Sequence, residues 1–159
     1  MEPLLQLLRT NARETDASLA RMLGLTPAAV QDKIAAYERQ GLIRGYRAVV
    51  NEDLANAGDV RAVIELRIRP ERSGGFDRIA QRIGQFPQVE EAFLMSGGYD
   101  LLLFVRGRNL QEVASFVSAE LAPLDGVLST ATHFMLKTYK DQGILMETAQ
   151  HDDRLQVAP

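Results

Sequence analysis

The strongest constraint on the fold is a strand–helix–strand pattern that occurs twice in succession between residues 60 and 136. In the first copy, apolar and charged residues alternate through residues 61–69, which is the period of a strand with one buried face. An apolar helical stripe follows over residues 76–83, after two glycines, and a second strand is expected over residues 89–96. These two strands and the helix between them form one structural unit.

The second copy repeats the same order of elements. Residues 101–105 form an apolar strand, Asn109 can cap a helix, and residues 127–136 supply a fourth strand. Two such units predict a ferredoxin-like β-α-β-β-α-β domain, which we place at residues 60–146. Because helices would cover only one face of this sheet, we expect the other face, with apolar residues such as Val63, to pair with a second copy of the chain.

Three short amphipathic helices are predicted ahead of that domain. The first covers residues 4–12, the second lies between a threonine cap and a glycine at residues 15–24, and the third begins at a Thr-Pro pair and covers residues 26–41. The short turn around a glycine between the last two helices is typical of a helix-turn-helix. Residues 43–51 are rich in β-forming side chains and are expected to add a strand or hairpin as a wing.

The chain is therefore expected to be an α+β protein, with an N-terminal winged helix-turn-helix followed by the ferredoxin-like domain. The helix-turn-helix domain covers residues 1–50. Small and polar residues at 51–59 are expected to form a linker, and the polar residues 147–159 are expected to form a tail.

Charge is distributed unevenly between the two parts. The net charge of the chain is −3, but residues 1–50 carry seven lysines and arginines against five acidic residues, whereas the remainder carries eleven against sixteen. A basic first part and an acidic second part permit nucleic-acid contact in the first part only.

The composition excludes several classes of function. The sequence has no cysteine and two histidines, His133 and His151, so a disulfide framework and thiol catalysis are excluded and few metal ligands are left. No nucleophile motif or phosphate-binding glycine loop is present, so we expect neither an enzyme nor a metal or other cofactor. Since the sequence also shows no long apolar run and no charged leader, we expect a cytoplasmic protein.

The third predicted helix is the candidate recognition helix. If the apolar stripe of Val30, Ile34 and Tyr37 faces the core, the 100° step per residue directs four residues outward, namely Ala28, Asp32, Ala35 and Arg39. Basic residues around them would contact phosphates. The candidate DNA-contacting residues are Thr26, Pro27, Gln31, Lys33, Arg39, Arg44 and Arg47. The alternative is a helix that only packs within a small bundle.

A second candidate site is the turn Ser-Gly-Gly-Tyr-Asp at residues 96–100. It can be a simple hairpin connection, because paired glycines supply positive φ wherever a tight turn needs it. Alternatively, its backbone groups and Asp100 can hold a zwitterion, which needs donors for its carboxylate and acceptors for its ammonium group. The candidate effector-binding residues in the turn are Gly97, Gly98, Tyr99 and Asp100.

Several stretches are together similar to one known family. Residues 19–27, 38–46 (ERQGLIRGY) and 95–102 (MSGGYDLL) resemble the helix-turn-helix, the wing entry and the glycine-x-tyrosine-aspartate turn of the Lrp/AsnC (feast/famine) transcription regulators. The resemblance covers residues 4–145. It implies a sequence-specific DNA-binding regulator that responds to a small amino-acid-like effector bound at subunit interfaces.

The resemblance also implies further site residues and partners. In the family, the effector turn combines with the last strand across a subunit boundary, and in this chain Thr130 and Thr132 share one face of that strand. Family members assemble from dimers into rings. The expected partners are therefore double-stranded DNA, the effector and other copies of the chain, in a homodimer and in a higher ring such as an octamer.

Two other functions stay open at this point. Sirohaem decarboxylases resemble the family in fold and act on a tetrapyrrole. Such an enzyme should display histidines and arginines in the sensing domain to hold carboxylates and assist chemistry, and His133 is the one histidine there. The other alternative is an oligomeric ligand-binding module whose helix-turn-helix has decayed. It is suggested by Ala35 and Ala36 beside Lys33, where many family members carry basic residues.

Overall fold

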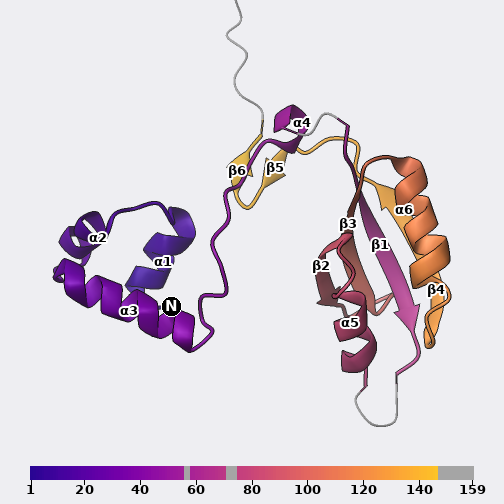
Figure 1. The fold of residues 1–159 in the computed structure, drawn as a ribbon, viewed down its shortest axis with the longest axis horizontal. Helices are drawn as coiled ribbons and strands as arrows, with labels where there is room; N and C mark the ends of the chain where they lie inside the picture. Colours follow the sequence, from indigo (N-terminus) through magenta and orange to yellow (C-terminus); the bar gives the residue numbers. More distant parts are fainter. Residues whose placement is uncertain (56–57, 71–74, 147–159) are drawn as a thin grey trace, which may run out of the picture. The chain divides into compact units, whose positions relative to one another are not determined.

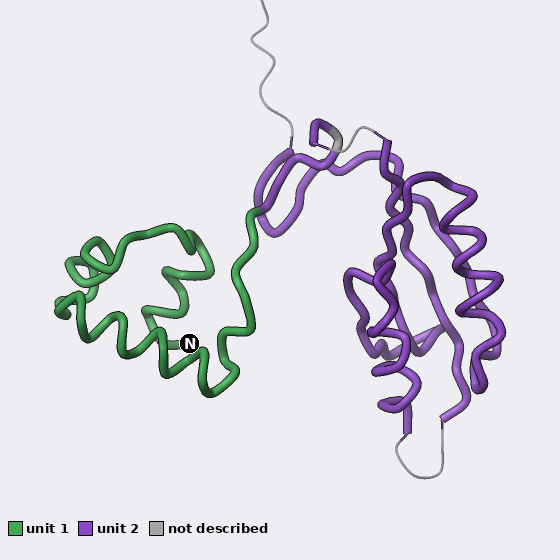
Figure 2. Tube along the Cα trace, viewed as in Figure 1, with its two compact units in different colours: residues 1–48 green, residues 49–159 purple. Residues whose placement is uncertain are grey.

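The chain forms two compact units that divide between Ala48 and Val49 (Figure 2). The computed structural model describes residues 1–55, 58–70 and 75–146, so the tail expected at 147–159 lies outside the described residues. None of the helices in these ranges has the length and apolar character that a membrane span requires.

Three helices make up the first unit: α1 (Pro3–Thr10), α2 (Asp16–Leu23) and α3 (Pro27–Arg39) (Figure 1). They pack around a small apolar core, whose buried members are Leu4, Leu19, Ala20, Val30 and Tyr37. Ile34 is partly buried against the same core, so the predicted inward stripe of α3 is confirmed.

Local sequence explains where these helices begin and end. The Thr15 hydroxyl accepts a hydrogen bond from the N–H of Ser18 at 3.1 Å, and the Thr26 hydroxyl accepts one from the N–H of Ala29 at 3.2 Å. Each contact satisfies a backbone donor that the first helical turn leaves free. Gly24 ends α2 with a φ of 66°, a left-handed conformation that favours glycine.

The wing expected at residues 43–51 is not a strand in this chain. These residues form neither helix nor strand, and no described strand pairs with them. Their β-forming side chains favour an extended chain, but a stable strand also needs a partner strand and a surface to pack on. Gly45 further weakens strand formation because it has no side chain to pack.

Part of the expected linker forms a short helix, α4 (Glu52–Ala55), within the second unit. A carboxylate oxygen of Glu52 lies 3.1 Å from Arg106 Nη2. The side-chain amide of Asn51 donates a hydrogen bond to the carbonyl of Met146 at 2.8 Å. These contacts tie the segment to the sensing domain.

The second unit contains the predicted ferredoxin-like domain (Figure 1). Its antiparallel sheet has the strand order β2-β3-β1-β4, with the bounds β1 (Val60–Ile68), β2 (Val89–Leu94), β3 (Leu101–Gly107) and β4 (Val127–Phe134). The helices that connect the strands are α5 (Asp77–Ile83) and α6 (Leu110–Phe116), which continues as a π-helical segment (Val117–Leu121). The element order confirms the predicted topology.

The second and fourth strands end at Leu94 and Phe134, each two residues before the predicted ends at residues 96 and 136. Beyond β4, the strands β5 (Lys140–Asp141) and β6 (Ile144–Leu145) form a small hairpin that sequence analysis missed. Strands of two residues are too short to show any periodicity.

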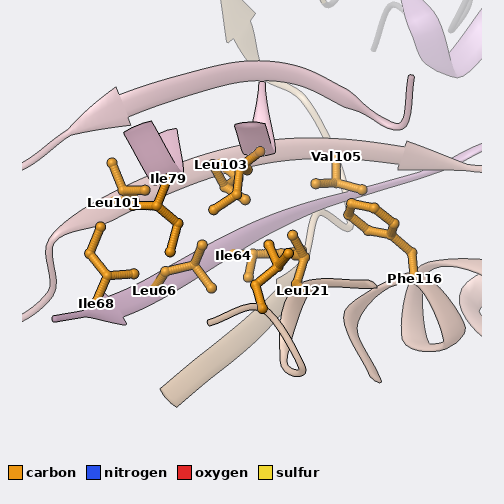
Figure 3. Close-up of a cluster of buried hydrophobic side chains, with 11 residues drawn as sticks. Ile64, Leu66, Ile68, Ile79, Leu101, Leu103, Val105, Phe116 and Leu121 are labelled. Atoms are coloured by element: carbon orange, nitrogen blue, oxygen red, sulfur yellow. The ribbon is translucent and has the colours of Figure 1, made fainter. Parts of the chain in front are cut away.

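Helices α5 and α6 cover one face of the sheet. Buried and more exposed residues alternate along β1 and β3, and Figure 3 shows the buried side chains meeting those of the helices in one apolar layer. The buried members of this core are Ile64, Leu66, Ile68, Ile79, Ile83, Leu101, Leu103, Val105, Phe116, Leu121 and Leu124.

The opposite face, here called the open face, carries the apolar residues Val63, Phe93, Leu102, Phe104 and Ala131. Strand register places them together, with Val63 opposite Phe104 and Phe93 opposite Leu102. The rings of Phe93 and Phe104 meet edge to face, with centroids 6.2 Å apart. Phe93 is nevertheless 45% exposed in the single chain. The apolar second face expected from the alternation is therefore present.

Candidate DNA-binding surface and effector turn

Helix α3 directs Ala28, Asp32 and Arg39 into solvent as expected, whereas Ala35 is partly buried. Arg39 is the last residue of the helix. Its guanidinium makes no hydrogen bond or ion pair with any residue of the described ranges. This side chain is therefore available for a base edge or a phosphate.

Lys33, a second candidate, is engaged within the first unit. Its ammonium nitrogen lies 2.9 Å from Glu2 Oε1, and the hydroxyl of Tyr37 donates a hydrogen bond to Glu2 Oε2. Sequence reasoning missed Glu2 because it precedes the first helix and belongs to no apolar pattern. The pairing with Glu2 offsets the charge of Lys33 on the helix surface.

The polar residues at the start of α3 have structural partners too. The side-chain amide of Gln31 donates a hydrogen bond to Asp16 Oδ2 at 2.7 Å, which joins α3 to the first residue of α2. Thr26 caps the helix, and Pro27 is exposed in its first turn. These contacts fix the angle between the two helices of the helix-turn-helix.

Arg44 and Arg47 are exposed in the segment after α3. The hydroxyl of Tyr46, between them, donates a hydrogen bond to Glu38 Oε1 at 3.0 Å. Burial raises the pKa of the Tyr46 hydroxyl, and the neighbouring Glu38 carboxylate raises it further. The contact ties the segment that carries the two arginines to the last turn of α3, although this segment forms no strand.

The candidate effector turn, residues 96–100, connects β2 to β3. Gly97 has a φ of 141°, which side chains rarely adopt, but Gly98 does not have a positive φ. Of the two glycines, it is therefore Gly97 whose backbone conformation requires the conformational freedom of glycine.

Asp100 connects this turn to the end of β1. Its Oδ2 accepts a hydrogen bond from the N–H of Ile68 at 2.8 Å, and its own N–H donates to the carbonyl of Leu66 at 2.8 Å. One carboxylate oxygen is thus used by the fold. The other, Oδ1, accepts no hydrogen bond from the described residues and can serve an ammonium group.

The turn also presents free hydrogen-bond donors. The backbone N–H groups of Gly97, Gly98 and Tyr99 find no acceptor in the part of the chain that the structure describes. Backbone donors of this kind require water or ligand oxygens. Three successive donors beside a free carboxylate oxygen can hold both ends of a zwitterion.

Arg67 on β1 is a neighbour of the turn that sequence reasoning missed. Its Nε donates a hydrogen bond to the carbonyl of Gly98 at 2.8 Å, across a sequence separation of 31 residues. Arg67 looks in the sequence like any other polar position of an alternating strand, so no local pattern could have indicated this contact.

Thr130 and Thr132 share one face of β4, as alternation predicted. They lie opposite Leu66 and Ile64 of β1 and are half-buried on the helix-covered face. Within one chain, β1 lies between β4, which carries these threonines, and β3, which follows the turn.

His133 lies on the other side of β4. Its Nε2 is 3.4 Å from Glu65 Oε1, which itself belongs to β1. Over residues 1–55, 58–70 and 75–146, no three histidine or acidic side chains gather as metal ligands would.

Two family models match the chain at these two places. A model described as winged helix-turn-helix DNA-binding matches residues 4–44, and one described as the Lrp/AsnC ligand binding domain matches residues 61–145.

Relatives match along nearly the whole chain. The HTH-type transcriptional regulator YugG of Bacillus subtilis is 39% identical over 157 residues, which are 98% of this chain and 95% of the relative. The proline dehydrogenase transcriptional activator of Rhodobacter capsulatus is 30% identical over 139 residues, which are 87% and 90% of the two chains.

Solved structures agree with the sequence matches. A transcriptional regulator of Neisseria meningitidis in complex with L-Met has a TM-score of 0.68 and 27% identity, over 87% of this chain and 88% of that chain. AsnC of E. coli shares the fold, with a TM-score of 0.67 and 22% identity over 89% and 93% of the two chains.

A DNA-binding helix-turn-helix joined to a ligand-binding ferredoxin-like domain defines a transcriptional regulator. The chain belongs to the Lrp/AsnC family of these regulators.

Proposed function

We propose that this protein is a homo-oligomeric, sequence-specific DNA-binding regulator whose DNA occupancy responds to an amino-acid effector at the turn 96–100. One observation carries the effector assignment: the successive N–H groups of Gly97, Gly98 and Tyr99 have no acceptor among the described residues, beside the free Oδ1 of Asp100. An α-carboxylate needs such donors, and an α-ammonium group needs such an acceptor. The Neisseria neighbour in complex with L-Met supports this class of ligand, and with it a regulatory rather than a catalytic role.

On the DNA side, Arg39 contacts a base edge in the major groove, and Arg44 and Arg47 contact phosphates. Thr26 and Pro27 place the start of α3 near the phosphate backbone. Gln31 contacts DNA only if its hydrogen bond to Asp16 breaks, and Lys33 contacts DNA only if its ion pair with Glu2 breaks. This supports a smaller set of phosphate contacts than the number of basic residues suggests.

The engagement of Lys33 and Gln31 within the first unit also favours a second candidate function. A module that assembles and binds a ligand, but no longer binds DNA, would keep these residues for the stability of the helix bundle. The two candidates differ in whether Arg39 meets DNA at all.

For assembly, we propose that the open face pairs with the open face of a second copy. Its apolar side chains, with Phe93 45% exposed, lie together on one face of the sheet and have the chemistry of a buried interface. Dimers would then combine into rings such as an octamer. In that assembly, Thr130 and Thr132 of a neighbouring subunit would complete the effector site, since within one chain β1 lies between their strand and the strand that follows the turn.

The test is a mobility-shift titration with the DNA upstream of the protein's own gene, repeated with each of the twenty standard amino acids. We expect a shifted complex, and at least one amino acid should change the apparent affinity by about 5- to 150-fold. The absence of any shift at low salt would support the module that does not bind DNA. A shift that no amino acid alters would overturn the effector assignment and leave DNA binding intact.

A further inference from the structure

We infer that Arg67 binds the carboxylate of the effector, together with the backbone N–H groups of the turn 96–100. The inference rests on the proposed effector function of that turn and specifies its ligand as a small molecule with a free carboxylate, of which α-amino acids are the class tested. It gives the site a fixed positive charge that the turn itself does not contain.

The first observation is the position of Arg67. It is the last residue of β1 that faces away from the core, and its side chain is exposed. Its Nε donates to the carbonyl of Gly98 at 2.8 Å, so the guanidinium contacts the turn, next to the residues whose N–H groups have no acceptor among the described residues.

The second observation is that the guanidinium keeps donors for which the described residues supply no acceptor. A guanidinium has five N–H donors in a rigid fork, and the bond to Gly98 uses the one at Nε. No carboxylate of the described residues lies within 4.0 Å of Arg67. By contrast, Arg106 lies 2.6 Å from Glu90, and Arg108 lies 3.0 Å from Glu112. Among the described residues, Arg67 is thus an arginine that contacts the turn and has no acidic partner.

The third observation concerns Asp100, the acidic residue of the turn. Asp100 directs Oδ2 to the N–H of Ile68 and forms no ion pair with Arg67. A positive and a negative group therefore stand beside the same turn without neutralising each other. This is the arrangement that an α-amino acid complements, with its carboxylate toward Arg67 and its ammonium group toward Asp100 Oδ1.

The ligand's carboxylate and the side chain of Arg67 can be changed independently, which gives a sharp test. Affinity is measured by calorimetry on the full chain, for each amino acid that raises the melting temperature in a screen of the twenty and for its carboxamide. We expect Arg67→Met to weaken binding of the acid by roughly 10- to 100-fold, as for the loss of one charge-assisted pair. The same change should leave binding of the carboxamide nearly unaltered.

Two further variants serve as controls. Arg69→Met removes a positive charge from the same end of β1, and its side chain makes no hydrogen bond or ion pair with the described residues. We expect it to bind the acid like the wild type. Arg67→Lys keeps the charge but not the planar fork, and its affinity should lie between those of the wild type and Arg67→Met.

The outcomes separate this inference from the proposed function. If Arg67→Met weakens binding of the acid and binding of the carboxamide equally, the residue only positions the turn and the inference is wrong. If Arg67→Met binds the acid as well as the wild type does, the inference is also wrong, while the effector site stands. If no amino acid binds the wild type, the proposed effector class and the inference both fall.

Discussion

The Oδ2 atom of Asp100 accepts a hydrogen bond from the backbone N–H of Ile68, 2.8 Å away, and so connects the effector turn to the end of β1. The other face of β1 contributes Val63 to the open face. A ligand that binds Asp100 therefore acts on a residue that also holds the central strand of the proposed subunit interface. We therefore expect an effector that binds at this turn to influence assembly.

Replacing Asp100 should destabilise the fold as well as remove a ligand contact. We expect Asp100→Ala to lower the free energy of unfolding by about 1–3 kcal/mol, because the Ile68 N–H loses its acceptor. Asp100→Asn keeps an oxygen acceptor, so its free energy of unfolding should fall by less than that of Asp100→Ala. Urea denaturation of the three proteins measures both changes, and equal stability of the wild type and Asp100→Ala would contradict the structural role.

The two glycines of the turn should respond differently to substitution. Gly97→Ala forces a side chain into the backbone conformation with a φ of 141° and should cost about 1–3 kcal/mol of stability. Gly98→Ala is the matched control, because its φ is ordinary and no atom lies within 4 Å of the added Cβ. Its stability should stay within about 0.5 kcal/mol of the wild type. Thermal unfolding measures both variants. If Gly98→Ala melted at a lower temperature than Gly97→Ala, the assignment of the strained conformation to Gly97 would be wrong.

Arg39 and Lys33 should contribute unequally to DNA binding. Arg39→Ala should weaken binding by about 1–3 kcal/mol, because Arg39 has no partner among the described residues and can contact a base edge. Lys33→Ala should have the smaller effect, since the ion pair with Glu2 already offsets its charge. Fluorescence anisotropy with the upstream DNA measures both affinities at the same salt concentration. An unchanged affinity for Arg39→Ala would remove this residue from the interface.

The open face should control assembly. Phe93→Glu places a charge beside Phe104 on that face and should shift the protein toward its 17.6 kDa monomer in light scattering. Leu136→Glu is the control, because Leu136 is 94% exposed and follows β4 rather than lying in the sheet. A wild type that is monomeric at micromolar concentration would contradict the interface, and so would an unchanged mass for Phe93→Glu.

Much of the fold could be predicted because its signals are local. Threonine caps, a glycine C-cap and apolar stripes define α2 and α3, and alternation along β1 identifies the two faces of the sheet. The segment at residues 43–51 shows where this reasoning ends. Its composition favours a strand, yet strand formation depends on a partner that sequence composition does not specify.

The sequence by itself determined the helix-turn-helix, the order of elements in the ferredoxin-like domain and the position of the glycine turn between β2 and β3, because caps and periodicity act over a few neighbouring residues. Only the tertiary structure decided what each site residue contacts. Lys33 forms an ion pair with Glu2, and one carboxylate oxygen of Asp100 accepts a hydrogen bond from the N–H of Ile68. Arg67 donates a hydrogen bond to the carbonyl of Gly98. The physical reason is that these pairs lie about thirty residues apart in the chain and meet only when helices pack and strands align in register.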